Sequence, residues 1–152
     1  MAGVLAHVNS GECSLVANAP KSILQIKAPT NQRLIIRSIR IFGKQPAGGT
    51  DTPVKIRLTR STANFGTFTG ATAQKNDPND AETLQATCGA NASVEPTSPT
   101  DGGLWWELQP QTGIIEPMAP GQEIKIPGGQ SAQFEFTSPG TPTVMMEATC
   151  EE

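Results

Sequence analysis

The stretch Arg33-Leu34-Ile35-Ile36-Arg37-Ser38-Ile39-Arg40-Ile41-Phe42 decides the fold class, because isoleucine-rich runs of this kind favour β-strands. Shorter runs of similar character recur at residues 54–58, 123–126 and 133–136. Turns that contain proline and glycine separate them, at residues 45–49, 119–121 and 127–129. Because no long helix crosses between these runs, the sequence predicts an all-β sandwich or barrel with antiparallel sheets and about eight strands.

Two of these runs differ in how their apolar residues alternate. In residues 54–60, Val54, Ile56 and Leu58 share one face, which we expect to point into the core. Residues 33–44 carry apolar side chains on both faces instead. We therefore expect either a β-bulge that switches the faces or a strand that is covered on both sides.

The 152 residues suit a single domain, and no linker divides them. Residues 1–19 are interpreted as an N-terminal arm or edge strand, and residues 20–152 as the β-sandwich domain. Residues 96–103 are rich in proline and threonine and are predicted to form an exposed loop. Residues 77–84 are predicted to form one short helix, with an Asp/Asn cap and acidic residues in its first turn.

Neither a metal site nor a cofactor is predicted. Asp77, Asp80 and Glu82 lie close together but lack the spacing of an EF-hand loop. The three cysteines are far apart and form no CxxC motif, so we interpret them as free thiols in preference to a disulfide framework or a shared metal site: Cys13, Cys88 and Cys150.

Charge is distributed unevenly along the chain. Residues 1–75 carry a net charge of +8 and residues 76–152 a net charge of −11, which together give −3. Because a sandwich interleaves the two halves, this pattern predicts either ordinary solvated charge or oppositely charged patches that pack against a partner. If residues 33–44 pair with residues 54–60, the basic side chains form one surface: Arg37, Arg40, Lys55 and Arg57.

Two adjacent tryptophans lie in the predicted strand at residues 104–108. Neighbouring residues of a strand point to opposite sides, so either Trp105 or Trp106 should enter the core while the other faces outward. The outward tryptophan is interpreted as an interface anchor, with a ligand platform as the alternative.

The residues for most kinds of catalysis are missing. The one histidine, His7, has no nucleophile motif or second histidine to work with, which argues against a Ser-His-Asp relay and a cupin-type metal centre. The glycine turns match no phosphate-binding motif. Nucleic-acid binding is not predicted, because the net charge is negative and no aromatic residues are interleaved with the basic ones. A glycosidase with two carboxylates stays open, although nothing selects a pair.

No apolar run approaches the roughly 18 residues of a membrane span. Residues 1–9 lack the basic and apolar regions of a signal peptide. The sequence therefore predicts a protein that folds in a cytoplasm and has no membrane partner.

The segment Gly113-Ile114-Ile115-Glu116-Pro117-Met118-Ala119-Pro120-Gly121-Gln122-Glu123-Ile124-Lys125-Ile126-Pro127-Gly128-Gly129-Gln130 places one strand between two proline–glycine turns. Residues 53–62, a Gly/Thr-rich segment and Asp77-Pro78 precede it. Together these resemble jelly-roll structural proteins of tailed bacteriophages, most of all capsid decoration, or cement, proteins. The resemblance covers residues 33–150 through the order of strands and turns.

The resemblance implies a single jelly-roll sandwich that acts as a virion structural protein and catalyses no reaction. It implies a homo-oligomer, with a trimer favoured, that adds to the outside of the capsid and bridges subunits of the major capsid protein. Assembly would take place in the host cytoplasm. The residues expected to make these contacts are Val4, Leu5, Val8, Arg37, Arg40, Arg57, Trp105 and Trp106.

Two other functions are compatible with the same pattern. A tail or fibre component, or a receptor-binding head, would bind a cell surface. A carbohydrate-binding β-sandwich module would use the exposed tryptophan to bind sugar.

Overall fold

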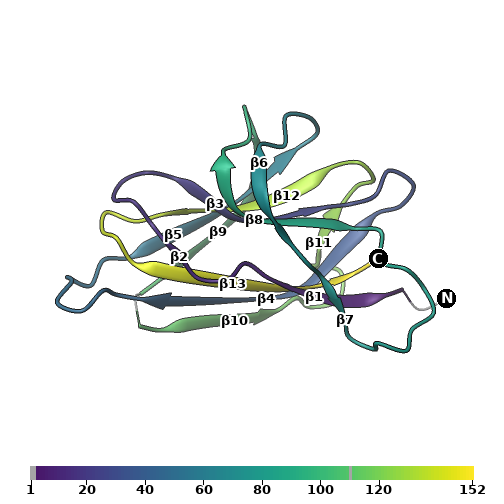
Figure 1. The fold of residues 1–152 in the computed structure, drawn as a ribbon, viewed down its shortest axis with the longest axis horizontal. Coiled ribbons are helices and arrows are strands. Elements are labelled where there is room, and N and C mark those ends of the chain that lie inside the picture. Colours follow the sequence, from purple (N-terminus) through teal and green to yellow (C-terminus); the bar gives the residue numbers. More distant parts are fainter. Residues whose placement is uncertain (1–2, 110) are drawn as a thin grey trace.

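Residues 3–109 and 111–152 are described by a computed structural model, and they form thirteen β-strands in two antiparallel sheets that pack as a sandwich (Figure 1). The prediction of an all-β antiparallel fold is confirmed. The strands are β1 (Leu5–Asn9), β2 (Cys13–Ser14), β3 (Lys21–Lys27), β4 (Leu34–Lys44), β5 (Val54–Ser61), β6 (Thr67–Ala71), β7 (Gln74–Lys75), β8 (Thr87–Val94), β9 (Thr100–Leu108), β10 (Gly113–Pro117), β11 (Ile124–Ile126), β12 (Ser131–Thr137) and β13 (Thr143–Glu151).

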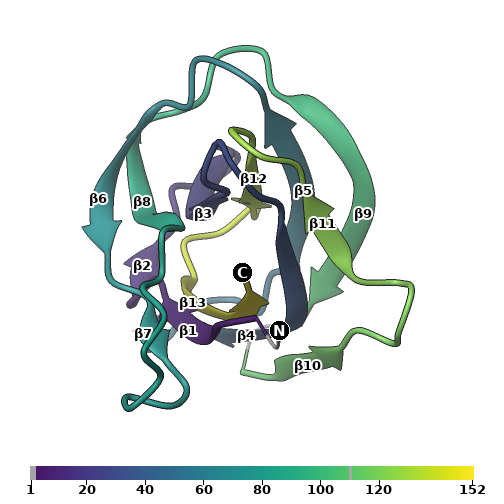
Figure 2. The same cartoon turned by 90° about the vertical axis from the view of Figure 1, so that its right-hand side faces the viewer.

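The two sheets face each other across the core, as the end-on view in Figure 2 shows. Sheet A has seven strands in the order β10-β4-β13-β1-β7, with β11 also paired to β4 and β2 to β13. Sheet B has six strands in the order β6-β8-β3-β12-β5-β9. The last two strands of the chain are therefore internal, because β12 lies between β3 and β5, and β13 lies between β4 and β1.

The prediction of about eight strands was too low, because turns divide some pairing segments into short pieces. β10 and β11 pair with different parts of β4 and are separated by a turn in which the amide of Gln122 bonds the carbonyl of Ala119. β2 and β7 have only two residues each. The loop predicted at residues 96–103 is also shorter than expected, since Thr100 and Asp101 pair with β5 as the start of β9.

The core lies between the sheets and consists mainly of isoleucine, leucine, valine and phenylalanine. Val54, Ile56 and Leu58 are fully buried, as their alternation predicts. In β4 the buried positions change phase between Ile36 and Ile39, and the register with β13 shifts at the same place. A β-bulge therefore switches the faces of β4, which was one of the two expectations for this strand.

The expected single basic surface is not formed, because β4 and β5 belong to different sheets. Arg37 and Arg40 lie on β4 in sheet A, whereas Lys55 and Arg57 lie on β5 in sheet B. The connection at residues 45–53 crosses from one sheet to the other instead of closing a hairpin.

The predicted helix at residues 77–84 is wrong; this segment forms turns. The carboxylates of Asp77 and Asp80 accept hydrogen bonds from the backbone amides of Asn79 and Glu82. The ammonium group of Lys75 donates to the carbonyls of Asp80 and Glu82. These side chains bond backbone groups that a helix would need, and such local bonds favour turns over helices.

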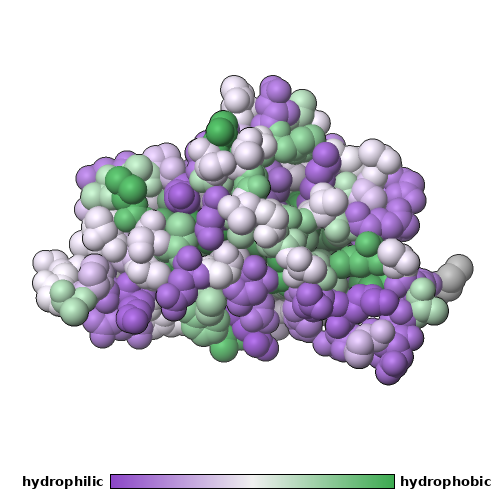
Figure 3. All heavy atoms as spheres, viewed as in Figure 1, coloured by the Kyte–Doolittle hydropathy of each residue, from purple (hydrophilic) through white to green (hydrophobic). Residues whose placement is uncertain are grey.

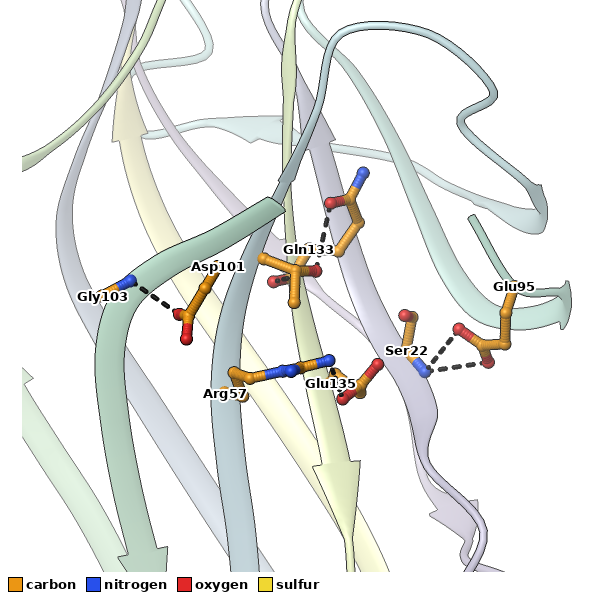
Figure 4. A network of polar contacts seen from close by, with 8 residues as sticks. Ser22, Arg57, Glu95, Asp101, Gly103, Gln133 and Glu135 are labelled. Carbon is orange, nitrogen blue, oxygen red and sulfur yellow. Dashed lines mark hydrogen bonds and ion pairs between the residues drawn. The ribbon is translucent and has the colours of Figure 1, made fainter. Parts of the chain in front are cut away.

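A buried polar layer covers the outer face of sheet B. Gln133 is fully buried and alternates along β12 with the core residues Ala132 and Phe134. Its side-chain amide donates to Ser131, and its carbonyl oxygen accepts from Thr59 at 3.3 Å (Figure 4). The polar layer consists of Gln25, Thr59, Ser61, Ser131 and Gln133.

Two long connections shield this layer from solvent. The β5–β6 and β8–β9 connections arch over the outside of β3 and β12 (Figure 2). The carbonyl of Phe65 accepts a hydrogen bond from the side chain of Gln25 at 2.8 Å. The carboxylate of Glu95 accepts from the backbone amide of Ser22 at 3.0 Å. Both connections are therefore hydrogen-bonded to β3 of sheet B. The buried side chains beneath them bond one another, as buried polar groups generally do.

The core position of β12 leads to a prediction about Phe134. Its side chain is fully buried, and its ring centroid lies 6.1 Å from that of Trp106. The substitution Phe134→Ala should lower the free energy of unfolding by about 3–5 kcal/mol, measured by urea denaturation. Phe42→Ala is the control, because Phe42 is 38% exposed on the outer face of sheet A. This substitution should lower the free energy of unfolding several-fold less. Equal losses in the two variants would contradict this account of the core.

Candidate functional site

The predicted contact residues do not gather in one place. Val4 and Val8 are 3% and 1% exposed, so their side chains belong to the core of this chain rather than to an outer surface. Val8 lies in β1, which pairs with β13 and, over two residues, with β7. Val4 directly precedes β1, and its amide donates to the carbonyl of Glu152. Leu5 is half-buried and lies opposite Glu151 in the ladder between β1 and β13.

The three predicted arginines are paired with glutamates from the second half of the chain. Arg37 binds Glu123 at 2.6 Å and also contacts Glu151. Arg40 lies 3.7 Å from Glu147, its opposite residue on β13. The sandwich therefore brings the basic half and the acidic half of the sequence together, which agrees with solvated, paired charge rather than with segregated patches.

The third arginine occupies a different sheet. The guanidinium of Arg57 lies 2.8 Å from the carboxylate of Glu135, its opposite residue on β12 (Figure 4). Arg57 and Glu135 are 33% and 16% exposed, so the pair is partly shielded from water. Partial shielding makes the pair less screened by salt than a fully exposed pair.

The two tryptophans point in opposite directions, as expected for adjacent strand residues. Trp106 is half-buried, packs against Phe134, and its indole N–H donates to the carboxylate of Glu116 on β10. This bond joins the edge strand of sheet B to the edge strand of sheet A. Trp105 is 57% exposed and is therefore the outward tryptophan.

Trp105 and its neighbours form the best candidate for a functional surface. The guanidinium carbon of Arg57 lies 5.6 Å from the centroid of the Trp105 ring, within the range of a cation–π contact. Glu135 holds Arg57 from the other side, and Lys55 and Glu107 face each other one pair further along the same strands. We call these five residues the Trp105 surface: Lys55, Arg57, Trp105, Glu107 and Glu135.

This surface has the composition of a protein contact. A large aromatic ring is fixed on a strand, and an arginine and two carboxylates surround it. Tryptophan and arginine are the residue types that most often dominate binding energy at protein interfaces. Leu104, next to Trp105, is 39% exposed and extends the apolar part of the edge.

The sequence indicates Arg57 and Trp105 as contact residues and places Lys55 on one surface with Arg57, but it gives no sign that Glu107 and Glu135 belong to the same surface. The alternation of residues 133–136 places Glu135 on the face opposite Phe134 and Phe136, so its outward orientation was readable. Its position beside Arg57 was not, because the register between β5 and β12 joins residues that are far apart in the chain.

The clefts of the described residues lie away from the Trp105 surface. A cleft of about 260 Å³ is lined by Val4, Gln32, Glu82, Thr83, Gln85 and Glu152. The carboxylate of Glu152 fills one side of it and accepts hydrogen bonds from the backbone amides of Gln85 and Ala86. A more open cleft of about 340 Å³ is lined mainly by small residues: Ala71, Thr72, Ala73, Leu84, Ala86, Thr87 and Cys88.

The three cysteines are free thiols. Burial raises the pKa of Cys88 to about 12, with a further contribution from Cys150 and Glu152. Burial and the nearby Glu152 raise the pKa of Cys150 to about 11. Residues 3–109 and 111–152 contain no group of three or more histidine, cysteine, aspartate or glutamate side chains suited to a metal ion.

The outer surface is mixed in character. On the face shown in Figure 3, apolar residues occur in small separate areas, and hydrophilic residues gather over the turn that follows β7. That turn carries Asp77, Asp80 and Glu82. Across the part of the chain that the structure covers, no helix has the length and apolar character needed to cross a membrane.

Comparisons with known proteins give little likeness. No family model matches the chain, and no curated protein matches it. The crystal structure of the Yersinia pseudotuberculosis-derived mitogen is similar over 97% of this chain and 86% of that chain, with 7% identity and a TM-score of 0.36. The cryo-EM structure of Broad Bean Stain Virus is similar over 98% of this chain and 78% of that chain, with 12% identity and a TM-score of 0.24. At these TM-scores neither likeness indicates a shared function.

The raised pKa of Cys88 predicts slow chemical modification. Iodoacetamide attacks the thiolate, and a pKa of about 12 in place of 9.0 lowers the thiolate fraction at pH 8 about a thousandfold. Alkylation of Cys88, followed by peptide mass spectrometry, should be far slower in the folded protein than in urea. Equal rates in the two states would show that the thiol is not buried as described.

The environment of Glu123 predicts an acid-sensitive contribution to stability. Hydrogen bonds from its own amide and from Gly121, together with the charges of Arg37 and Lys125, hold the pKa of Glu123 below its usual value of 4.5. Because the pKa of Glu123 is lower in the folded state, its carboxylate adds to the free energy of unfolding above pH 4.5. This contribution is lost as the pH falls through the folded-state pKa.

The variant Glu123→Gln should therefore show a smaller drop in melting temperature between neutral pH and acidic pH than the unmodified chain. Glu82→Gln is the control, since Glu82 is exposed in a turn. Thermal melts that fall by the same amount in all three proteins would rule out the contribution of Glu123.

Proposed function

We propose that this chain is a jelly-roll virion structural protein that decorates and stabilises a bacteriophage capsid by bridging capsid subunits. In this proposal it catalyses no reaction, assembles as a homo-oligomer with a trimer favoured, and contacts the major capsid protein on the outside of the particle.

The strand order supports the jelly-roll part of the proposal. Without the short strands and the inserted β6–β8 segment, sheet A reads β10-β4-β13-β1 and sheet B reads β3-β12-β5-β9. The chain then passes between the sheets at each connection except the one from β5 to β9. Eight strands wrapped in this way describe a double-sheet jelly roll, an architecture that occurs in viral capsid proteins and in lectin domains.

The Trp105 surface is the observation that carries the contact part of the proposal. A tryptophan that is 57% exposed loses much apolar surface to water when a partner covers it. Arg57 and Glu135 already hold their positions by pairing with each other, so little side-chain order has to be created on binding. Such a preorganised aromatic anchor suits a lasting contact between protein subunits.

The same surface also favours one other function, a carbohydrate-binding module. An exposed indole ring flanked by Lys55, Arg57 and Glu107 offers a stacking platform together with hydrogen-bonding groups. Sugar binding by the purified chain that disappears in Trp105→Ala would favour this function over capsid decoration.

The capsid proposal is tested with particles that lack this protein. Purified chain is added to capsids of the phage that encodes it, and bound copies are measured after sedimentation. We expect saturable binding that Trp105→Ala weakens about thirtyfold, as for a hot spot of about 2 kcal/mol. Val16→Ala is the control, because Val16 is 65% exposed but lies outside the Trp105 surface. Absence of binding, or equal binding by both variants, would overturn the proposal.

A further inference from the structure

Strand β9 is the longest edge strand of sheet B, and its second half is free of the bulge that interrupts its first half. The edges of sheet B are β6 and β9, and those of sheet A are β10 and β7, together with the short strands β11 and β2 that pair with β4 and β13. β7 has two residues, β10 ends at Pro117, and the register of β6 with β8 shifts between Thr67 and Thr69. β9 pairs regularly with β5 from Trp105 to Leu108 and contains neither lysine nor proline. Long edges without these protective residues are templates for pairing with another strand.

We propose that β9 pairs antiparallel with β9 of a second copy of this chain, about a two-fold axis at Trp106. The contact would join sheet B of the two copies into one continuous sheet. This inference assigns the Trp105 surface to a second copy of the chain and a dimer in place of the trimer. It is therefore an alternative to direct contact between Trp105 and the capsid protein, and it does not depend on attachment to a capsid.

A bulge limits which part of β9 can pair regularly. Gly103 has a positive φ of 77°, and the register with β5 shifts between Arg57 and Thr59. From Trp105 to Leu108 the pairing with β5 is regular. A new strand would therefore meet a regular edge over residues 105–108 and an irregular one before them.

Residues opposite each other in an antiparallel pair share a face, which leaves few two-fold registers. An axis at Glu107 would place that carboxylate directly opposite its copy, and like charges in this position are destabilising. An axis at Trp105 would place Glu107 opposite Gly103 in the bulge. Of these three axes, only the one at Trp106 keeps Glu107 away from its own copy and from Gly103, and it pairs the regular residues 105–107 with one another.

In that register the charges of the two copies are complementary. Within one chain Arg57 is opposite Trp105, and Lys55 is opposite Glu107. Pairing about Trp106 places Trp105 of each copy opposite Glu107 of the other. On the outer face of the joined sheet, one row of neighbouring side chains then runs across the strands. It contains Glu135, Arg57 and Trp105 of one copy, followed by Glu107 and Lys55 of the second copy, so the charges on either side of the indole ring alternate in sign. A carboxylate beside the positive edge of an indole ring is a favourable neighbour.

The other face of β9 also gains a contact. Leu104 is 39% exposed, whereas Leu108 is 1% exposed and marks the end of the core. The register places Leu104 of each copy opposite Leu108 of the other. The pairing therefore covers an exposed leucine and an exposed tryptophan at once, and it predicts a dimer where the resemblance implies a trimer.

Disulfide trapping tests this register directly. In a Cys13→Ser, Cys88→Ser background, one chain carries Trp105→Cys and a second carries Glu107→Cys. Mixing the two variants under mild oxidation should give a disulfide-linked dimer that contains one chain of each kind. Either variant oxidised alone should give no disulfide-linked dimer, because its introduced cysteines do not face each other. The control mixture contains Trp105→Cys with Glu82→Cys, since Glu82 lies in an exposed turn away from β9. Equal crosslinking in the control mixture, or none in the test mixture, would overturn the register.

The mass of the unmodified chain gives a second test that needs no cysteine variant. Sedimentation over a range of concentrations should show a monomer–dimer equilibrium that Trp105→Ala shifts at least tenfold toward monomer, because the second copy no longer covers the exposed indole ring. A monomer or a trimer at all concentrations would overturn the pairing and leave capsid binding untouched. A dimer that fails to bind capsids would support the pairing and contradict only the proposed function.

Discussion

The structure depends on the insertion of the last two strands between strands of the first half of the chain. β12 completes sheet B between β3 and β5, and β13 completes sheet A between β4 and β1. Neither sheet is continuous until the end of the chain is in place, because β3 and β5, like β4 and β1, have no direct ladder with each other. Folding therefore requires contacts between residues that are far apart in sequence, a topology that is expected to fold slowly.

The same insertion explains the charge pattern. The basic half of the sequence supplies β4 and β5, and the acidic half supplies the strands that lie against them. Arg40 meets Glu147 and Arg57 meets Glu135 as opposite residues in these ladders. A difference of charge along the chain becomes pairing across the sheets, so the outer surface shows mixed charge instead of one basic and one acidic side. Cross-strand pairs of this kind add to the specificity of the register as well as to its stability.

Local features were predictable and long-range ones were not. The alternation at residues 54–60 predicted the core face of β5. The broken alternation at residues 33–44 predicted either a bulge or a strand covered on both faces, and the structure has the bulge. The prediction of a helix at residues 77–84 was wrong because Lys75, Asp77 and Asp80 bond backbone groups of this segment. Which backbone groups these side chains reach depends on the folded structure. Opposite orientations of the tryptophans followed from strand geometry, but which one faces outward depends on the phase of β9 relative to the core. The partners of Arg57 could not be predicted, because they depend on the register of β5 with β12 and β9, and local sequence patterns do not determine that register.

The position of Trp105 is set by the core and not by the surface alone. Trp106, the next residue, packs against Phe134 and donates a hydrogen bond to Glu116 on the other sheet. Because the backbone at Trp106 is held in this way, the direction of the Trp105 side chain is fixed before any partner arrives. Arg57 then restricts the indole ring from one side. An anchor whose backbone and ring are already ordered loses little entropy when it is covered, so more of its buried apolar area is retained as binding energy. The core packing of one tryptophan thus determines how well its neighbour can serve as a contact.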